Sequence, residues 1–108
     1  MRKVLFEGYW FTVCKDESEL KRKMVEIYGE KRPYEEYHHI FGRIGILKLV
    51  VENVIPINEN YHRMQKAMKI KDRILFEDMV HRKIDILTYN RLGRMANYIK
   101  NINVLFGK

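Results

Sequence analysis

The chain has 108 residues, a length that suits one small domain. Lysine and arginine number 21, and aspartate and glutamate 14, which gives a formal net charge of +7 and a sequence pI of about 9.6. With 46% hydrophobic residues but only 6 glycines and 2 prolines, the composition excludes fibrous, low-complexity and wholly disordered proteins. The single Cys14 excludes an internal disulfide framework and a cysteine zinc ribbon, which favours a cytoplasmic protein.

The basic charge favours polyanionic partners, either nucleic acid or an anionic membrane surface, although such a charge can also serve solubility alone. Lys48 interrupts the longest apolar stretch, residues 44–51, and no run approaches the ~18 residues that a membrane span needs. Glu7 follows the first basic residues too closely for a signal peptide. We therefore expect no membrane partner, and nucleic acid becomes the first candidate.

The N-terminal segment is rich in β-branched and aromatic residues, which favours strands at about residues 3–6 and 9–13. Glu7-Gly8 stands where a two-residue hairpin turn belongs. The aromatic run from Tyr9 to Phe11 could stack on nucleic-acid bases. Core packing is the favoured interpretation, because a small domain needs their area.

A helix is expected next. Asp16 with Glu19 three residues later is a capping-box pattern, and Gly29 is well placed to end the helix. The apolar residues between them share one helical face: Leu20, Met24, Ile27 and Tyr28.

The middle of the chain begins a second unit. Residues 30–37, broken by Pro33, are expected to form a linker, and residues 53–58 a strand whose Pro56 suits an edge position. A helix with Asn58 or Asn60 as its N-cap follows, carrying Met64, Ala67, Met68 and Ile74.

Two more helices are expected near the C-terminus, separated by a turn at Tyr89-Asn90. The sequence thus predicts one small α+β domain. Its parts are an N-terminal hairpin and helix within residues 1–29, a central unit at about 36–70 and C-terminal helices within 75–105.

Three of the four histidines lie in the central unit. His38 and His39 end a short strand, Asn53 opens the next strand, and His62 lies in the first turn of the following helix. This strand–loop–strand–helix order should bring His38 and His62 within reach of one ion, and the pleat should point His39 to the opposite side. Neutral imidazole is a common ligand for borderline metals, and a further histidine can take a proton from water near neutral pH. The fourth histidine, His81, is expected on a helix surface.

Two segments carry a family resemblance. Residues 37–43 read Tyr-His-His-Ile-Phe-Gly-Arg, and residues 52–62 read Glu-Asn-Val-Ile-Pro-Ile-Asn-Glu-Asn-Tyr-His. Together they resemble the motif of the HNH endonucleases, the ββα-metal or His-Me finger nucleases. The match includes the histidine pair, the asparagine that opens the second strand and the nine-residue step from Asn53 to His62, and it covers roughly residues 36–70.

The resemblance implies a role for each matching residue. His38 and His62 would bind one divalent metal ion (Mg, Mn, Ni, Co or Zn), His39 would act as the general base, and Asn53 would brace the loop that holds His39. It also implies DNA as substrate, and a phage or mobile element as the setting.

The chain departs from the family pattern at several positions. Asn58 and Tyr61 stand where many members carry a second cysteine pair, so a structural zinc is predicted absent. Lys66 stands where colicin-type members add a histidine, so the metal should be held weakly. Lys66, Arg43 and Arg63 are expected to contact nucleic acid, with a surface salt bridge as the alternative for Arg43.

The sequence therefore predicts a metal-dependent HNH endonuclease that hydrolyses phosphodiester bonds in DNA, by nicking or by double-strand cleavage. Because no separate specificity module is evident, a second copy of the chain or an accessory protein is a further expected partner. The leading alternative is a non-catalytic nucleic-acid-binding module on an HNH-like scaffold. A third is a basic interaction protein whose histidines are incidental.

Overall fold

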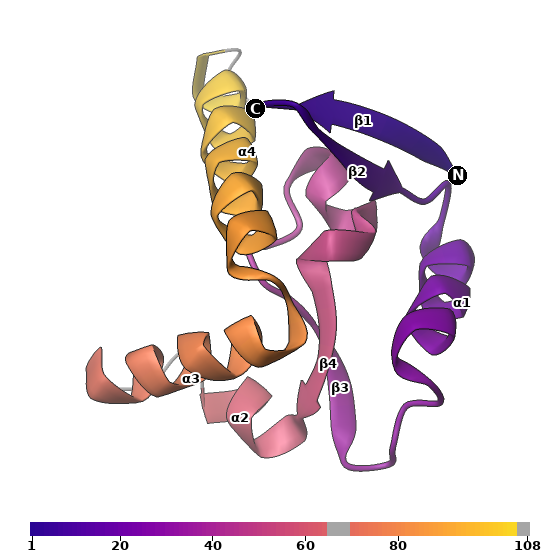
Figure 1. Cartoon of the computed structure of the whole chain (residues 1–108), viewed down its shortest axis with the longest axis vertical. Coiled ribbons are helices and arrows are strands. Elements are labelled where there is room, and N and C mark those ends of the chain that lie inside the picture. The colour runs from indigo at the N-terminus through magenta and orange to yellow at the C-terminus, as the bar shows by residue number, and fades with distance from the viewer. Residues whose placement is uncertain (65–69, 106–108) are drawn as a thin grey trace.

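The computed structural model describes residues 1–64 and 70–105 (Figure 1). It is an α+β fold, as predicted. Two 3-10 helices, Gly45–Leu49 and Val51–Asn53, connect the third and fourth strands. The strands and α-helices, in chain order, are β1 (Arg2–Phe6), β2 (Tyr9–Val13), α1 (Glu17–Tyr28), β3 (Glu35–His39), β4 (Val54–Asn58), α2 (Glu59–Met64), α3 (Ile70–Lys83) and α4 (Ile86–Leu105).

The strands β1 and β2 form the predicted antiparallel hairpin, closed where Phe6 pairs with Tyr9. Glu7 and Gly8 have φ angles of 49° and 76°, the left-handed backbone that a two-residue primed turn requires. Because side chains alternate along β2, Phe11 is fully buried while Trp10 is 57% exposed on the outer face. The expectation that Trp10 packs in the core is therefore wrong.

Helix α1 begins and ends as predicted. The Asp16 side chain accepts a hydrogen bond from the Glu19 amide at 2.8 Å, and Gly29 ends the helix with a φ of 82°. Leu20 and Met24 are buried, but Ile27 is 55% exposed, so only part of the predicted apolar face packs.

The antiparallel pair β3–β4, followed by α2, forms a ββα unit in which His38 pairs with Ile55 and His39 with Val54. β3 already begins at Glu35, which pairs with Asn58, so the predicted linker over 30–37 is too long. Successive residues of a strand face opposite sides, so the sheet has two buried faces. Figure 1 shows β3 and β4 between α1 and the pair α2 and α3.

The C-terminal part consists of α3 and α4. The break between them lies at Asp85, whose Oδ2 accepts hydrogen bonds from the amides of Leu87 and Thr88. The predicted turn at Tyr89-Asn90 is wrong, because both residues lie inside α4. Lys66, Ala67 and Met68, also assigned to a helix, lie outside the described residues.

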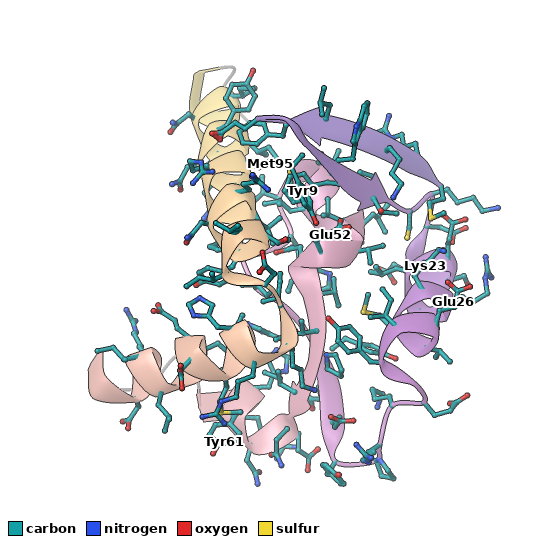
Figure 2. All side chains as sticks on the ribbon, in the orientation of Figure 1. Tyr9, Lys23, Glu26, Glu52, Tyr61 and Met95 are labelled. Carbon is teal, nitrogen blue, oxygen red and sulfur yellow. The ribbon has the colours of Figure 1, made fainter. Side chains whose placement is uncertain are left out.

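Helix α4 covers the first hairpin. Tyr9 and Met95 lie between β2 and α4 (Figure 2), in a cluster that also contains Phe11 and Leu92. Within residues 1–64 and 70–105, no helix combines the length and the apolar character needed to cross a bilayer.

Candidate functional site

The last two residues of β3 present imidazoles on opposite faces of the small sheet. His38 is 5% exposed and lies on the face covered by α2 and α3, whereas His39 is half-buried and lines a cleft beside α1. The alternation of side chains along a strand causes this split. The unit therefore offers one histidine to each side of the strand end.

His38 and His62 lie side by side. Their ring centroids are 5.1 Å apart with an interplanar angle of 71°, and Phe76 from α3 packs edge-on against His38 at 5.3 Å. Burial lowers the pKa of His38 to about 4, and the neighbouring His62 and His39 add to the effect. His38 is thus neutral at pH 7, which is the form that binds a metal.

Glu36 orients His62. Its Oε2 lies 2.5 Å from His62 Nδ1, and this contact lowers the pKa of the carboxyl group. Since a carboxylate accepts, His62 Nδ1 is the donor in this contact, and Nε2 is the ring nitrogen left to face a ligand. A carboxylate behind a ligating histidine is a common feature of metal sites. The sequence interpretation missed Glu36, although its spacing of two residues before His38 on a strand puts both on one face.

His39 is held by the backbone of the connecting segment. Its Nε2 donates to the carbonyl oxygen of Lys48 at 3.0 Å, so the lone pair lies on Nδ1. Nδ1 is buried and has no hydrogen-bond partner among the residues that the structure describes. This nitrogen carries the free lone pair, but it is shielded from solvent in this structure, so the ring or its neighbours must shift before it can accept a proton from water. Burial lowers the pKa of His39, against the opposing effect of the Lys48 carbonyl.

Asn53 fixes the segment that follows His39. The residue is fully buried, and its Oδ1 accepts from the Phe41 amide at 2.9 Å. Its Nδ2 donates to the carbonyls of Gly42 and Leu47 at 3.0 and 2.9 Å. The Asn53 side chain thus holds both the start of the loop after β3, at Phe41 and Gly42, and the first 3-10 helix, at Leu47. The bracing that the resemblance assigns to Asn53 corresponds to these contacts.

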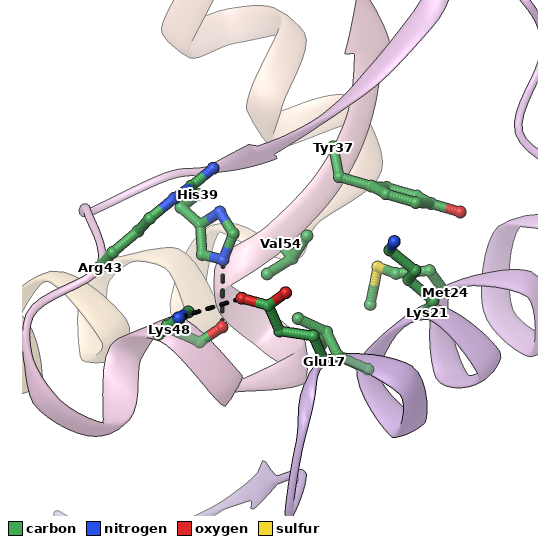
Figure 3. A pocket seen from close by; sticks show the side chains of 9 residues that line it. Glu17, Lys21, Met24, Tyr37, His39, Arg43, Lys48 and Val54 are labelled. Carbon is green, nitrogen blue, oxygen red and sulfur yellow. Dashed lines mark hydrogen bonds and ion pairs between the residues drawn. The ribbon is translucent and has the colours of Figure 1, made fainter.

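A cleft of about 160 Å³ opens beside His39 (Figure 3). Arg43 lines it, as do Lys48 and, from α1, Lys21. Glu17 pairs with Lys48 at 3.0 Å, and this contact lowers the pKa of the Glu17 carboxyl group. The alternative for Arg43 was a surface salt bridge. Among the described residues it is Lys48, not Arg43, that pairs with the glutamate beside the cleft, Glu17. The structure therefore brings Arg43 beside His39 in a cationic cleft.

The remaining predicted residues lie elsewhere. Arg63 is exposed on α2, one position after His62, and its guanidinium reaches Glu59 at 3.4 Å. Lys66 lies outside the described residues. His81, expected on a surface, is half-buried, because its ring packs on Tyr89 at 4.5 Å.

The residues fit a weakly held divalent cation. Within the residues that the structure describes, no three or more His, Cys, Asp or Glu side chains form a cluster that could hold a metal ion. Two adjacent imidazoles, one neutral and one backed by a carboxylate, are a donor set that borderline metals accept. The remaining coordination positions would fall to water and to the substrate.

The chain matches no protein-family model, and comparisons with curated proteins and with solved structures give no significant match.

Proposed function

We propose that this protein is a metal-dependent endonuclease of the HNH type that hydrolyses phosphodiester bonds in DNA, by nicking or by double-strand cleavage. The observation that carries the proposal is the packing of His38 from β3 against His62 from α2 at 5.1 Å. His39, on the other face of β3, and Asn53, which fixes the segment after His39, also support it.

In the proposed mechanism the general base and the metal ligands lie on opposite faces of β3. Hydrolysis by in-line displacement needs the attacking and leaving oxygens on opposite sides of phosphorus. Once substrate binding opens His39 Nδ1 to a water, Nδ1 takes a proton from that water, the water oxygen attacks phosphorus, and the bond to the 3′-oxygen breaks. The 3′-oxygen gains a proton from solvent, so the products are a 3′-hydroxyl and a 5′-phosphate.

His38 and His62 would hold the divalent ion on the side of the leaving oxygen. When bound, the ion supplies positive charge next to a phosphate oxygen and the departing 3′-oxygen. Arg43 neutralises phosphate charge beside His39, and Arg63 extends the basic surface along α2.

The proposal includes the partners and the setting. DNA is the substrate, and a second copy of the chain or an accessory protein supplies sequence selection. We place the activity in the cytoplasm, in a phage or mobile-element context.

A plasmid-nicking assay tests the proposal. Wild-type protein should relax supercoiled DNA with Mg²⁺, Mn²⁺ or Ni²⁺ and should be inactive with EDTA. His62→Ala should lose activity at low metal and regain part of it at high metal, because the loss is one of ligation. Arg82→Ala, an exposed change on α3, should leave the rate unchanged.

Two results count against the nuclease. Binding of DNA without cleavage under every metal condition favours the non-catalytic binding module. Equal rates for wild type and for His62→Ala at every metal concentration mean that any nicking seen comes from a contaminant.

A further inference from the structure

The cleft between α1 and β3 has an apolar floor, to which the proposed hydrolysis assigns no role. Its floor consists of buried apolar side chains: Leu20 is 6% exposed, Met24 1% and Val54 1%. Tyr37 lines it too, and in Figure 3 the Tyr37 and His39 side chains flank Val54. Tyr37 and His39 share this face because they are two residues apart on β3. An apolar floor with an aromatic side chain at its edge suits a flat ring.

The size of the cleft limits that ring. Its volume is about 160 Å³. An apolar cavity of about 150 Å³ holds one benzene ring. The cleft thus has room for a single six-membered ring and is small for a fused ring pair. Among the parts of a nucleic acid, a pyrimidine base fits this description.

The upper part of the cleft carries positive charge. Lys21 and Arg43 are exposed, and the Lys48 side chain is 49% exposed. These residues come from α1, from the loop after β3 and from the first 3-10 helix, with Lys21 on the Tyr37 side of the cleft and Arg43 and Lys48 on the His39 side (Figure 3). The ligand should therefore carry an anionic group next to its ring.

Among the described residues that line the cleft, Glu17 is the one with a carboxylate, and it pairs with Lys48 at 3.0 Å. Both side chains are largely exposed, so the pair contributes little stability and a phosphate can take the place of Glu17. Loss of the Glu17 charge should then strengthen anion binding in the cleft.

We propose that this cleft binds an unpaired pyrimidine nucleotide of the substrate strand, with the base on the floor, its phosphate beside Arg43 and Lys48, and Lys21 adding positive charge from the Tyr37 side. The inference rests on the proposed function, because it places one nucleotide beside the scissile bond. It also implies a preference for single-stranded or locally unpaired DNA, since a paired base cannot enter the cleft.

Methyl NMR of the full chain tests the proposal without metal and without cleavage. In protein labelled at the methionine methyl groups and kept in EDTA, thymidine 5′-monophosphate and a short oligothymidylate should shift the Met24 resonance, assigned with Met24→Leu. The buried Met95 methyl, in the cluster under α4, should not move. The oligonucleotide should bind about tenfold tighter or better, because it adds phosphate contacts. Deoxyribose 5-phosphate and inorganic phosphate should leave Met24 unmoved.

Matched variants on α1 sharpen the test. Lys21→Ala should weaken binding of thymidine monophosphate about fivefold, the loss of one charge-assisted contact. Arg22→Ala and Lys23→Ala should have little effect, since neither side chain lines the cleft and Lys23 pairs with Glu26 at 2.9 Å (Figure 2). Glu17→Gln should strengthen binding.

Several results overturn the inference. They are an unmoved Met24 methyl, an equal shift with inorganic phosphate, equal losses for Lys21→Ala and Arg22→Ala, or preferred cleavage of fully paired DNA. A wild type that nicks plasmid but shows no Met24 response refutes the nucleotide cleft and leaves the nuclease standing. A Met24 response in a protein without cleavage refutes the nuclease and leaves a nucleotide-binding site.

Discussion

Asn53 is the residue on which the geometry of the site depends most. Its side chain makes three hydrogen bonds, and no solvent reaches it. Removing it takes the hydrogen-bond partner from the Phe41 amide and from the Gly42 carbonyl, whereas the Leu47 carbonyl keeps its bond from the Val50 amide at 3.4 Å. Each such loss costs about 1–3 kcal/mol.

We therefore expect Asn53→Ala to lower the free energy of unfolding by about 3 kcal/mol. Urea unfolding followed by circular dichroism measures this change. Asn101→Ala, on the exposed side of α4, is the matched control and should change stability by less than about 0.5 kcal/mol. A similar small loss for Asn53→Ala would mean that water replaces its hydrogen bonds and that Asn53 braces nothing.

Glu36 acts at the same scale through His62. Glu36→Gln keeps the shape but removes the charge that fixes the His62 tautomer, so Mn²⁺ or Ni²⁺ affinity should fall about 10–100-fold. Isothermal titration calorimetry without DNA measures this, with Glu30→Gln as the exposed control. Unchanged affinity in Glu36→Gln would show that Glu36 merely forms a surface ion pair.

At the scale of elements, Asp85 separates the two C-terminal helices. Its carboxylate caps α4 through the amides of Leu87 and Thr88. We expect Asp85→Ala to lower stability by about 1 kcal/mol, the usual value of an N-cap. Asp78→Ala, which breaks only the exposed pair with Arg82, should cost clearly less in the same denaturation experiment. Equal losses would show that the cap is not what stabilises the start of α4.

Elements with strong local signals were predictable from the sequence. The Glu7-Gly8 turn and the Asp16 cap each depend on neighbours within three residues, so the hairpin and α1 could be placed correctly. The boundary between α3 and α4 carries no glycine or proline. Tyr89 instead resembled a turn residue, yet it is fixed in α4 by packing against Phe41 and His81.

In the candidate site, too, local features could be predicted from the sequence and contacts between distant segments could not. The order of His38, Asn53 and His62 was visible in the sequence, and the split of His38 and His39 between two faces follows from the pleat. The cleft was not visible, because Lys21 lies far from His39 in sequence and only the packing of α1 on the sheet brings them together.

For the whole molecule, the formal charge of +7 means that DNA affinity should fall as the salt concentration rises. Each phosphate contact contributes a slope of about −0.9 to the plot of log affinity against log salt concentration. Arg43→Ala should reduce the magnitude of the slope by about 1. Fluorescence anisotropy with labelled DNA across a salt series measures this slope. Arg82→Ala is the control, because it removes the same single positive charge from an exposed position on α3. If both variants change the slope equally, net charge alone governs binding and Arg43 makes no specific contact.

In the proposed mechanism, His39 removes a proton from the attacking water. A base must be neutral, so the rate should rise with pH through the pKa of His39 and then level off. Because burial lowers the pKa of His39, this rise should lie below the ordinary histidine value of about 6.5. Saturating metal keeps the ligands His38 and His62 from dominating the same rise.

The most direct test is therefore the single-turnover cleavage rate as a function of pH at saturating metal, for wild type and for His39→Ala. The variant should bind DNA as wild type does, cleave about 10²–10⁴-fold more slowly and lose the acidic rise in rate. A variant that cleaves at the wild-type rate with the same pH profile would contradict the account. A variant that loses DNA binding together with activity would assign His39 a structural role.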